Sequence, residues 1–103
     1  FEVAPAEIEA VLHGHPAVLD CAVFGVADPS AGERPVAAVV IDPESTVTTD
    51  ELRQLVVETL ATYKHPRTVV AVDTIPRLPS GKVLRRTLAA NWDADTDTLR
   101  PIH

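Results

Sequence analysis

The sequence predicts one α+β domain, in which helices cover a small sheet of about three main strands. Helix-like and strand-like segments follow one another in the order helix, strand, strand, helix, strand, helix. The chain has 103 residues, of which 46% are hydrophobic and 23% charged, which is enough for one core but not for two. Apolar runs at 21–24 and 36–41 argue against disorder and are too short to cross a bilayer.

Residues 6–13 are predicted to form the first helix. Pro5 suits the first turn of a helix, and Glu7 and Glu9 would lie near the positive end of its dipole. Its apolar residues recur at helical spacing and fall on one face: Ile8, Val11 and Leu12. A glycine and a proline follow closely, which ends the helix.

Two strands are expected next. Residues 18–26 are rich in β-branched and apolar side chains, which predicts the first strand. The turn-forming cluster Asp28-Pro29-Ser30 then begins a loop that is expected to reach Pro35. Residues 36–41 are apolar throughout, so they predict a second strand that is covered on both faces.

A second helix and a final group of short elements complete the prediction. Thr48, with Glu51 three residues on, resembles a capping box at the start of a helix of about three turns. The apolar side chains of that helix are Leu52, Leu55, Val56 and Leu60. The remaining segments are predicted as a strand, a loop stiffened by proline, a short basic helix and a flexible tail: 68–72, 76–81, 83–90 and 93–103.

The charge of the chain is unevenly distributed. A net charge of −6 argues against nucleic acid as a general partner, because phosphate backbones are bound mainly by clustered Lys and Arg. Residues 63–92 nevertheless contain one acid, Asp73, and six basic side chains: Lys64, Arg67, Arg77, Lys82, Arg85 and Arg86. A basic segment on an acidic protein suits a small polyanion such as a nucleotide. A solvated basic face without a ligand is equally compatible with this pattern.

Several kinds of site are excluded or disfavoured by the sequence. Ser80-Gly81-Lys82 is not a Walker A loop, since Pro76 stands where that pattern needs Gly, and the next residue is Val rather than Ser or Thr. His13 and His15 lack further ligands nearby, so no metal site is predicted. The motifs of self-contained hydrolases are absent. The single Cys21 is interpreted as a small buried hydrophobe in a reducing cytosol.

Lys82 is the remaining candidate for chemistry. Gly81 allows the backbone of its loop to approach a ligand closely, and Pro76 and Pro79 stiffen the loop. An ammonium group held in this way could stabilise negative charge that develops on a phosphorus centre. An ordinary exposed lysine is the alternative, and the physical argument alone favours that alternative.

Four separated motifs, in order, make the chain resemble a known family across residues 1–92. They lie at 1–9, in the segments 15–18, 28–29 and 32–35, at Tyr63-Lys64-His65-Pro66, and from Ile75 to Arg86. Together they resemble the C-terminal domain of the superfamily of acyl-CoA synthetases, nonribosomal-peptide adenylation domains and luciferases. The wording of residues 1–9 looks closest to the luciferase and coumarate-ligase branch, so fatty-acid-type or coumarate-type CoA ligases are the nearest likeness.

The resemblance implies a two-step reaction. A carboxylic acid attacks the α-phosphate of ATP to give an acyl-adenylate and pyrophosphate; the domain then rotates and the thiol of CoA takes the acyl group. Lys82 matches the lysine of the first step. Six positions match the family's approach to CoA: Ser30, Ala31, Gly32, Tyr63, His65 and Arg67. Ala31 stands where relatives can offer an aromatic side chain for the adenine ring.

The resemblance also implies partners and co-substrates. ATP, with Mg²⁺ bound mainly by the N-terminal domain, and CoA would be the co-substrates. The chief partner would be that N-terminal adenylation domain, which also holds the acyl pocket. Because Phe1 is not an initiator Met, the chain is interpreted as a fragment, inactive alone, of a cytoplasmic enzyme without a transmembrane segment. Its lid domain would span 1–92, with a flexible tail at 93–103.

Two other interpretations remain open at this point. The chain could be the lid of an adenylation domain that loads a carrier protein, in which a phosphopantetheine arm replaces CoA. It could also be a stand-alone interaction domain in which Lys82 is incidental.

Overall fold

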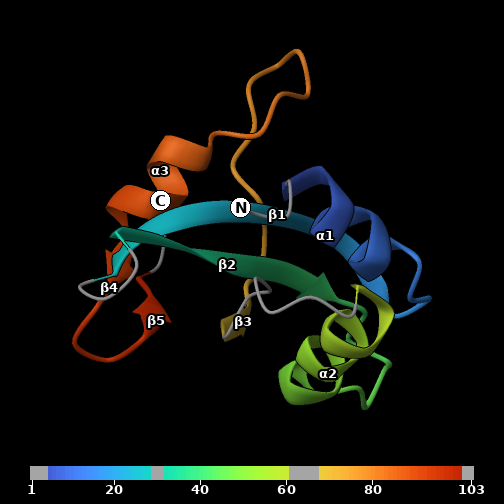
Figure 1. The fold of residues 1–103 in the computed structure, drawn as a ribbon. Coiled ribbons are helices and arrows are strands. Elements are labelled where there is room, and N and C mark those ends of the chain that lie inside the picture. Colours follow the sequence, from blue (N-terminus) through green and yellow to red (C-terminus); the bar gives the residue numbers. More distant parts are fainter. Residues whose placement is uncertain (1–4, 29–31, 61–67, 101–103) are drawn as a thin grey trace.

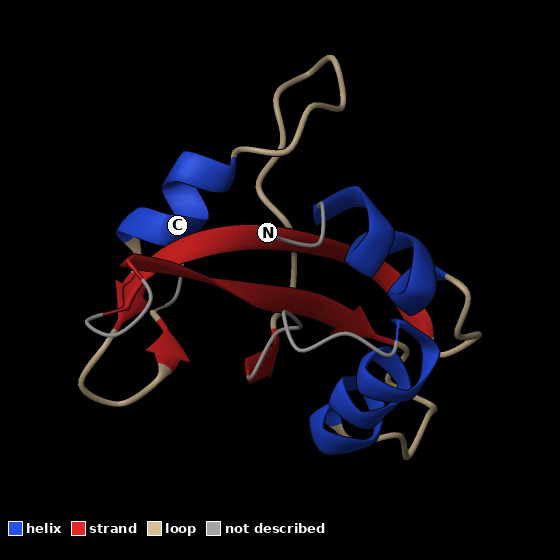
Figure 2. Cartoon of the chain, viewed as in Figure 1, coloured by secondary structure: helices blue, strands red, loops and turns tan. Residues whose placement is uncertain are grey.

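The computed structural model describes residues 5–28, 32–60 and 68–100, which form two helices and a sheet in the N-terminal part and three short elements in the C-terminal part. Figures 1 and 2 show the arrangement. The elements in chain order are α1 (Pro5–His13), β1 (Val18–Asp28), β2 (Gly32–Ile41), α2 (Thr49–Leu60), β3 (Thr68–Ala71), α3 (Arg85–Ala90), β4 (Trp92–Asp93) and β5 (Thr98–Leu99). The α+β class and the three-stranded main sheet predicted from the sequence are therefore confirmed.

The main sheet is mixed, with β2 in its centre. Strand β1 pairs with β2 antiparallel, and β3 pairs with β2 parallel through residues 36–39. Four successive residues of β2 are fully buried, and they alternate between two cores on opposite faces of the sheet: Val36, Ala37, Ala38 and Val39. A strand that is apolar throughout is what such a doubly covered position requires, as the sequence predicted.

Each face of the sheet has its own helices. Helices α1 and α2 cover one face and pack Ile8, Leu12, Leu52 and Val56 against it. Helix α3 and the β4–β5 hairpin cover the other face, where Leu88 meets Phe24 and Ile75. The predicted cap of α2 is present, since the Glu51 N–H donates to Thr48 Oγ1 at 3.1 Å.

Strand β1 contains a β-bulge at Leu19. Val18 pairs with Ile41 and Asp20 pairs with Val40, so Leu19 is an extra residue on β1. The bulge lets Val18 and Cys21 face the same core although they are an odd number of residues apart. It also leaves Leu19 57% exposed. Beyond the bulge, Asp20 shares a face with Ala22 and Phe24, which is the face covered by α3.

Strand β2 begins earlier than predicted. The loop expected to reach Pro35 ends instead at Gly32, which has a positive φ of 80° and pairs with Asp28. Pro35 lacks an N–H, but it lies just before the segment paired with β3, where β2 has only one hydrogen-bonding neighbour. The sheet therefore tolerates this proline inside a strand.

From Asp93 to Arg100, where the sequence predicts a frayed tail, the described residues include two short paired strands. Strands β4 and β5 pair as a small hairpin, and the Arg100 N–H donates to Asn91 O at 2.8 Å. Trp92 packs edge to face on Phe24, with ring centroids 6.3 Å apart. Arg34 stacks over the Trp92 ring at 5.8 Å and pairs with Asp97 at 2.9 Å. The sequence could not show this, because the contacts join residues far apart in the chain.

We expect Leu88→Ala to lower the free energy of unfolding by about 2–5 kcal/mol, because Leu88 is fully buried and its loss leaves a cavity beneath α3. Leu19→Ala is the matched control, and it should change that free energy by less than about 0.5 kcal/mol, because the bulge exposes this leucine. Urea denaturation followed by circular dichroism measures both. Equal losses would contradict the assignment of Leu88 to the core.

Candidate active-site loop

Lys82 lies on a tight hairpin between β3 and α3. Arg77 and Val83 form an antiparallel bridge, and the N–H groups of Leu78 and Leu84 donate to Lys82 O and Pro76 O, each at 2.9 Å. The turn is closed by the Gly81 N–H, which donates to Leu78 O at 2.8 Å. Gly81 has a φ of 93°, a conformation that favours glycine. The sequence predicted the loop but not this internal pairing. Because the pairing includes Val83 and Leu84, α3 begins at Arg85 rather than at the predicted residue 83.

The tip of this hairpin stands clear of the core. Figure 1 shows it projecting beyond the sheet and away from β3. Every residue from 77 to 82 is exposed, whereas Ile75 just before it is buried. The Lys82 side chain makes no hydrogen bond or ion pair with any residue that the structure describes. Its ammonium is therefore available to a ligand, as a catalytic lysine on a separate domain would need to be.

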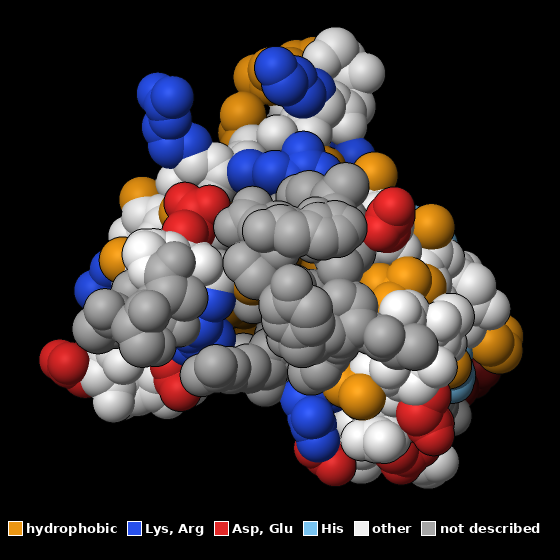
Figure 3. Space-filling view, in the orientation of Figure 1, with side chains coloured by type: hydrophobic (Ala, Val, Ile, Leu, Met, Phe, Trp, Pro, Cys, Tyr) orange, Lys and Arg blue, Asp and Glu red, His pale blue; other side chains and the backbone are white. Residues whose placement is uncertain are grey.

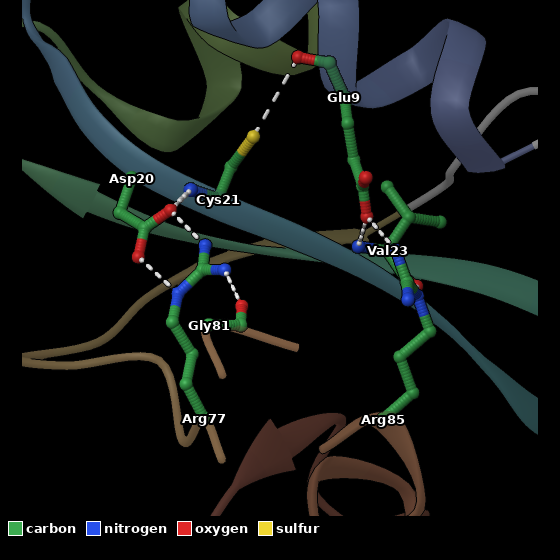
Figure 4. Close-up of polar contacts among 7 residues, drawn as sticks. All are labelled: Glu9, Asp20, Cys21, Val23, Arg77, Gly81 and Arg85. Carbon is green, nitrogen blue, oxygen red and sulfur yellow. Dashed lines mark hydrogen bonds and ion pairs between the residues drawn. The ribbon is translucent and has the colours of Figure 1, made fainter. Parts of the chain in front are cut away.

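Arg77 connects the hairpin to β1. Its guanidinium contacts both oxygens of the Asp20 carboxylate, with Nη2–Oδ1 at 2.7 Å and Nε–Oδ2 at 3.3 Å (Figure 4). Its third bond runs from Nη1 to Gly81 O at 2.7 Å. The hydrogen bond to Asp20 raises the pKa of the Arg77 guanidinium further above its ordinary value, so the group is always charged.

A second ion pair holds the segment that follows the hairpin. Arg85, at the start of α3, donates from Nε to Val23 O and from Nη2 to Glu9 Oε2, both at 2.8 Å. The same oxygen of Glu9 accepts the Val23 N–H at 2.7 Å. Figure 4 shows that these contacts bring α1, β1 and α3 together. They also satisfy the backbone of Val23 on the edge of β1 that faces away from β2.

Cys21 is not a nucleophile. Its side chain is 2% exposed and lies in the core beneath α1, as the sequence predicted, with Sγ 3.6 Å from Glu9 O. Burial raises the pKa of the thiol from 9.0 to about 12, with smaller contributions from the charges of Glu9 and Asp20. A thiolate, which is the reactive form, is therefore suppressed at neutral pH.

We expect the stability difference between wild type and Cys21→Ala to shrink as the pH rises from about 9 to about 12. The thiol of the unfolded chain ionises near 9.0, while the folded thiol stays protonated, so rising pH favours the unfolded state. Below pH 9 the contribution of Cys21 should be fully present. Urea denaturation of both proteins between pH 7 and pH 10.5 measures the difference, and a constant gap would contradict the raised pKa.

Gly32 is the one predicted CoA contact that the structure describes, and it does not lie beside the Lys82 hairpin. Gly32 is exposed and lies at the start of β2, opposite the end of β1. Arg77 forms its ion pair with Asp20, near the beginning of β1. Asp20 is about 25 Å along the strand from Asp28, the residue that pairs with Gly32. The other five predicted contacts of CoA lie outside the described residues: Ser30, Ala31, Tyr63, His65 and Arg67.

Positively charged side chains are concentrated around the Lys82 hairpin. In Figure 3, Lys and Arg side chains gather over the hairpin and α3, whereas acidic side chains dominate the region of α2. Among the described residues, the basic ones of this region are Arg77, Lys82, Arg85 and Arg86. Asp20 and Glu9 neutralise two of them, which leaves Lys82 and Arg86. The sequence could not identify Asp20 or Glu9, because their partners are 57 and 76 residues away.

The described residues contain no group of three or more His, Cys, Asp or Glu that could hold a metal ion. No helix among them is long and apolar enough to span a membrane.

Comparison with known proteins decides the family. The sequence pattern of the AMP-binding enzyme C-terminal domain matches residues 7–82, a segment that ends at Lys82. The chain belongs to this family. The resemblance seen in the sequence motifs is thereby confirmed.

Individual relatives are CoA ligases and acyl-CoA synthetases. The chain is 49% identical over 94 residues to 4-coumarate–CoA ligase 5 of Oryza sativa subsp. japonica, covering 91% of this chain and 17% of that protein. ATP-bound MatB from Rhodopseudomonas palustris superposes with a TM-score of 0.84 at 33% identity, over 92% of this chain and 19% of the other. A fatty acyl CoA synthetase from Mycobacterium tuberculosis superposes with a TM-score of 0.79 at 38% identity. The match covers 88% of this chain and 18% of the other. The chain thus spans less than a fifth of the length of these relatives.

Proposed function

We propose that the chain is the C-terminal catalytic lid of an ATP-dependent carboxylate:CoA ligase of the AMP-forming class. The observation that carries the proposal is the exposed Lys82, whose side chain has no partner among the described residues and which stands beside the turn of a tight hairpin. The family membership supports it, and so do relatives at about half identity that are named 4-coumarate–CoA ligases. These names favour CoA over a carrier protein as the acceptor.

In this proposal Lys82 acts in the first step. The carboxylate oxygen attacks the α-phosphate of ATP, and pyrophosphate leaves. Negative charge grows on the oxygens around phosphorus during the attack, and the Lys82 ammonium offsets it. The N-terminal domain would hold ATP, its Mg²⁺ and the acid. In the second step the thiol of CoA, after losing its proton, attacks the acyl carbonyl and AMP leaves.

The identity of the acid and the location of the enzyme are part of the proposal. The relatives include ligases named for 4-coumarate and a synthetase named for fatty acyl groups, so both hydroxycinnamic and fatty acids are candidate substrates, and fatty acid metabolism is one candidate role. A buried single thiol suits a cytoplasmic enzyme, since it needs no oxidising compartment.

We expect Lys82→Ala, in the enzyme that contains this chain, to slow pyrophosphate release by about 10²- to 10³-fold. Conversion of supplied acyl-adenylate to acyl-CoA should stay close to wild type, because that step does not need the lysine. A pyrophosphate-release assay across a panel of hydroxycinnamic and fatty acids measures the first step and identifies the substrate. Arg86→Ala is the control, since it removes another exposed charge from the same region.

Two results would contradict the assignment of Lys82. Normal pyrophosphate release by Lys82→Ala would return the chain to the interaction-domain interpretation. An equal loss in both half-reactions would show that the lysine is not specific to adenylation.

The proposed CoA contacts give a separate prediction. Arg67→Glu should raise the KM for CoA more than the KM for ATP, because a carboxylate at this position would repel the phosphates of CoA. Steady-state kinetics with each co-substrate varied in turn measures both constants. An unchanged KM for CoA would remove Arg67 from the CoA site without affecting the role of Lys82.

A further inference from the structure

We propose that Arg77 is a positioning residue that aims the Lys82 hairpin, and that Asp20 is the anchor to which Arg77 holds it. This inference rests on the proposed function, since it assigns Arg77 to the adenylation step through Lys82. Arg77 itself is not proposed to touch a substrate.

The need for such an anchor follows from the exposure of the hairpin. Residues 77–82 are all exposed, so no buried side chain fixes the direction in which the tip points. The backbone bonds of the hairpin fix its internal shape, but they do not attach it to the sheet. Among the described residues of the tip, Arg77 alone forms a side-chain bond to the sheet.

A continuous chain of short hydrogen bonds runs from the sheet to the residue beside Lys82. The Cys21 N–H donates to Asp20 Oδ1 at 2.9 Å, which fixes the carboxylate on its own strand. The same oxygen accepts Arg77 Nη2 at 2.7 Å, and Arg77 Nη1 donates to Gly81 O at 2.7 Å. Figure 4 shows the guanidinium lying between the strand and the turn. Because Gly81 O belongs to the peptide that leads into Lys82, the fork restrains that peptide directly.

The β-bulge places Asp20 for this task. The extra residue, Leu19, turns Asp20 toward the face that α3 covers, while Val18 and Cys21 remain in the opposite core. Bulges commonly re-aim a side chain beside a functional site. The bulge leaves Leu19 exposed to solvent. The placement of Asp20 as an anchor gives a reason for this unfavourable exposure.

The Asp20–Arg77 ion pair is better suited to orienting the Lys82 hairpin than to stabilising the fold. Exposed ion pairs contribute little to the free energy of folding, and this pair is partly exposed on both sides. A two-pronged contact between guanidinium and carboxylate, however, fixes direction as well as distance, which a lysine could not do. Small errors in the placement of a catalytic group slow the reaction strongly: a displacement of roughly 1 Å can lower the rate about 10²-fold.

Arg77→Gln in the full-length enzyme tests the inference. We expect the rate constant for pyrophosphate release to fall about 10- to 100-fold with little change in the KM for ATP. Conversion of supplied acyl-adenylate should remain within about twofold of wild type, and this retained activity also shows that the variant is folded. The rate constant for pyrophosphate release by Arg77→Lys should lie between those of wild type and Arg77→Gln, since lysine keeps the charge but loses the two-pronged contact with the carboxylate. Arg53→Gln is the control, because it breaks a remote ion pair on α2.

Asp20→Asn separates positioning from direct binding of ATP. If Arg77 serves only to hold the hairpin, Asp20→Asn should slow pyrophosphate release in the same way, and the double variant should be no slower than Arg77→Gln alone. If Arg77 instead binds a phosphate, removal of the Asp20 charge should leave that step unchanged or faster. The second result would overturn the inference.

The remaining outcomes are also distinguishable. Wild-type pyrophosphate release by Arg77→Gln, beside a large loss for Lys82→Ala, would refute the positioning role and leave the proposed function standing. No loss for Lys82→Ala would overturn both. An equal loss of both half-reactions with a lowered Tm would show that the pair is merely structural.

Discussion

The burial of β2 on both faces is the constraint on which the rest of the structure depends. Four successive residues without exposed surface require cover above and below the sheet. Helices α1 and α2 supply it on one face, and α3 with the β4–β5 hairpin supplies it on the other. Because β1 is paired with β2 along almost its whole length, the position of β1 is fixed in turn. The candidate site is built on that fixed strand.

The outer edge of β1 carries the polar contacts that matter for the site. An exposed strand edge offers unpaired N–H and C=O groups, which proteins commonly cover. Glu9 and Arg85 cover the edge at Val23, and Asp20 bonds the neighbouring Cys21 N–H. These side chains also attach α1, α3 and the Lys82 hairpin to the sheet. The same group of side chains therefore protects the strand edge and supports the Lys82 hairpin.

The sequence allowed much of the fold to be predicted, because hydrophobic spacing and turn residues act locally. It predicted both longer helices, the covered strand β2, the Thr48 cap and the loop that carries Lys82. Contacts between distant residues were out of reach: the Asp20–Arg77 anchor, and the packing of Trp92 and Asp97 that orders the expected tail. The motifs located Lys82 from its neighbours in the chain, but the hairpin that carries it is held through Arg77 by Asp20, which lies 57 residues before Arg77.

The positions of Gly32 and Lys82 bear on how one small domain could serve two reaction steps. Gly32 lies opposite the far end of β1, whereas the Lys82 hairpin is held near the strand's beginning, about 25 Å away along β1. Both are tied to the same strand, and packed cores on both faces make that strand stiff. Local loop movement could not bring one to the place of the other. Under the proposed function, with Lys82 serving adenylation and Gly32 contacting CoA, the change from the first step to the second would need the whole domain to turn, and the Arg77 anchor would carry Lys82 with it.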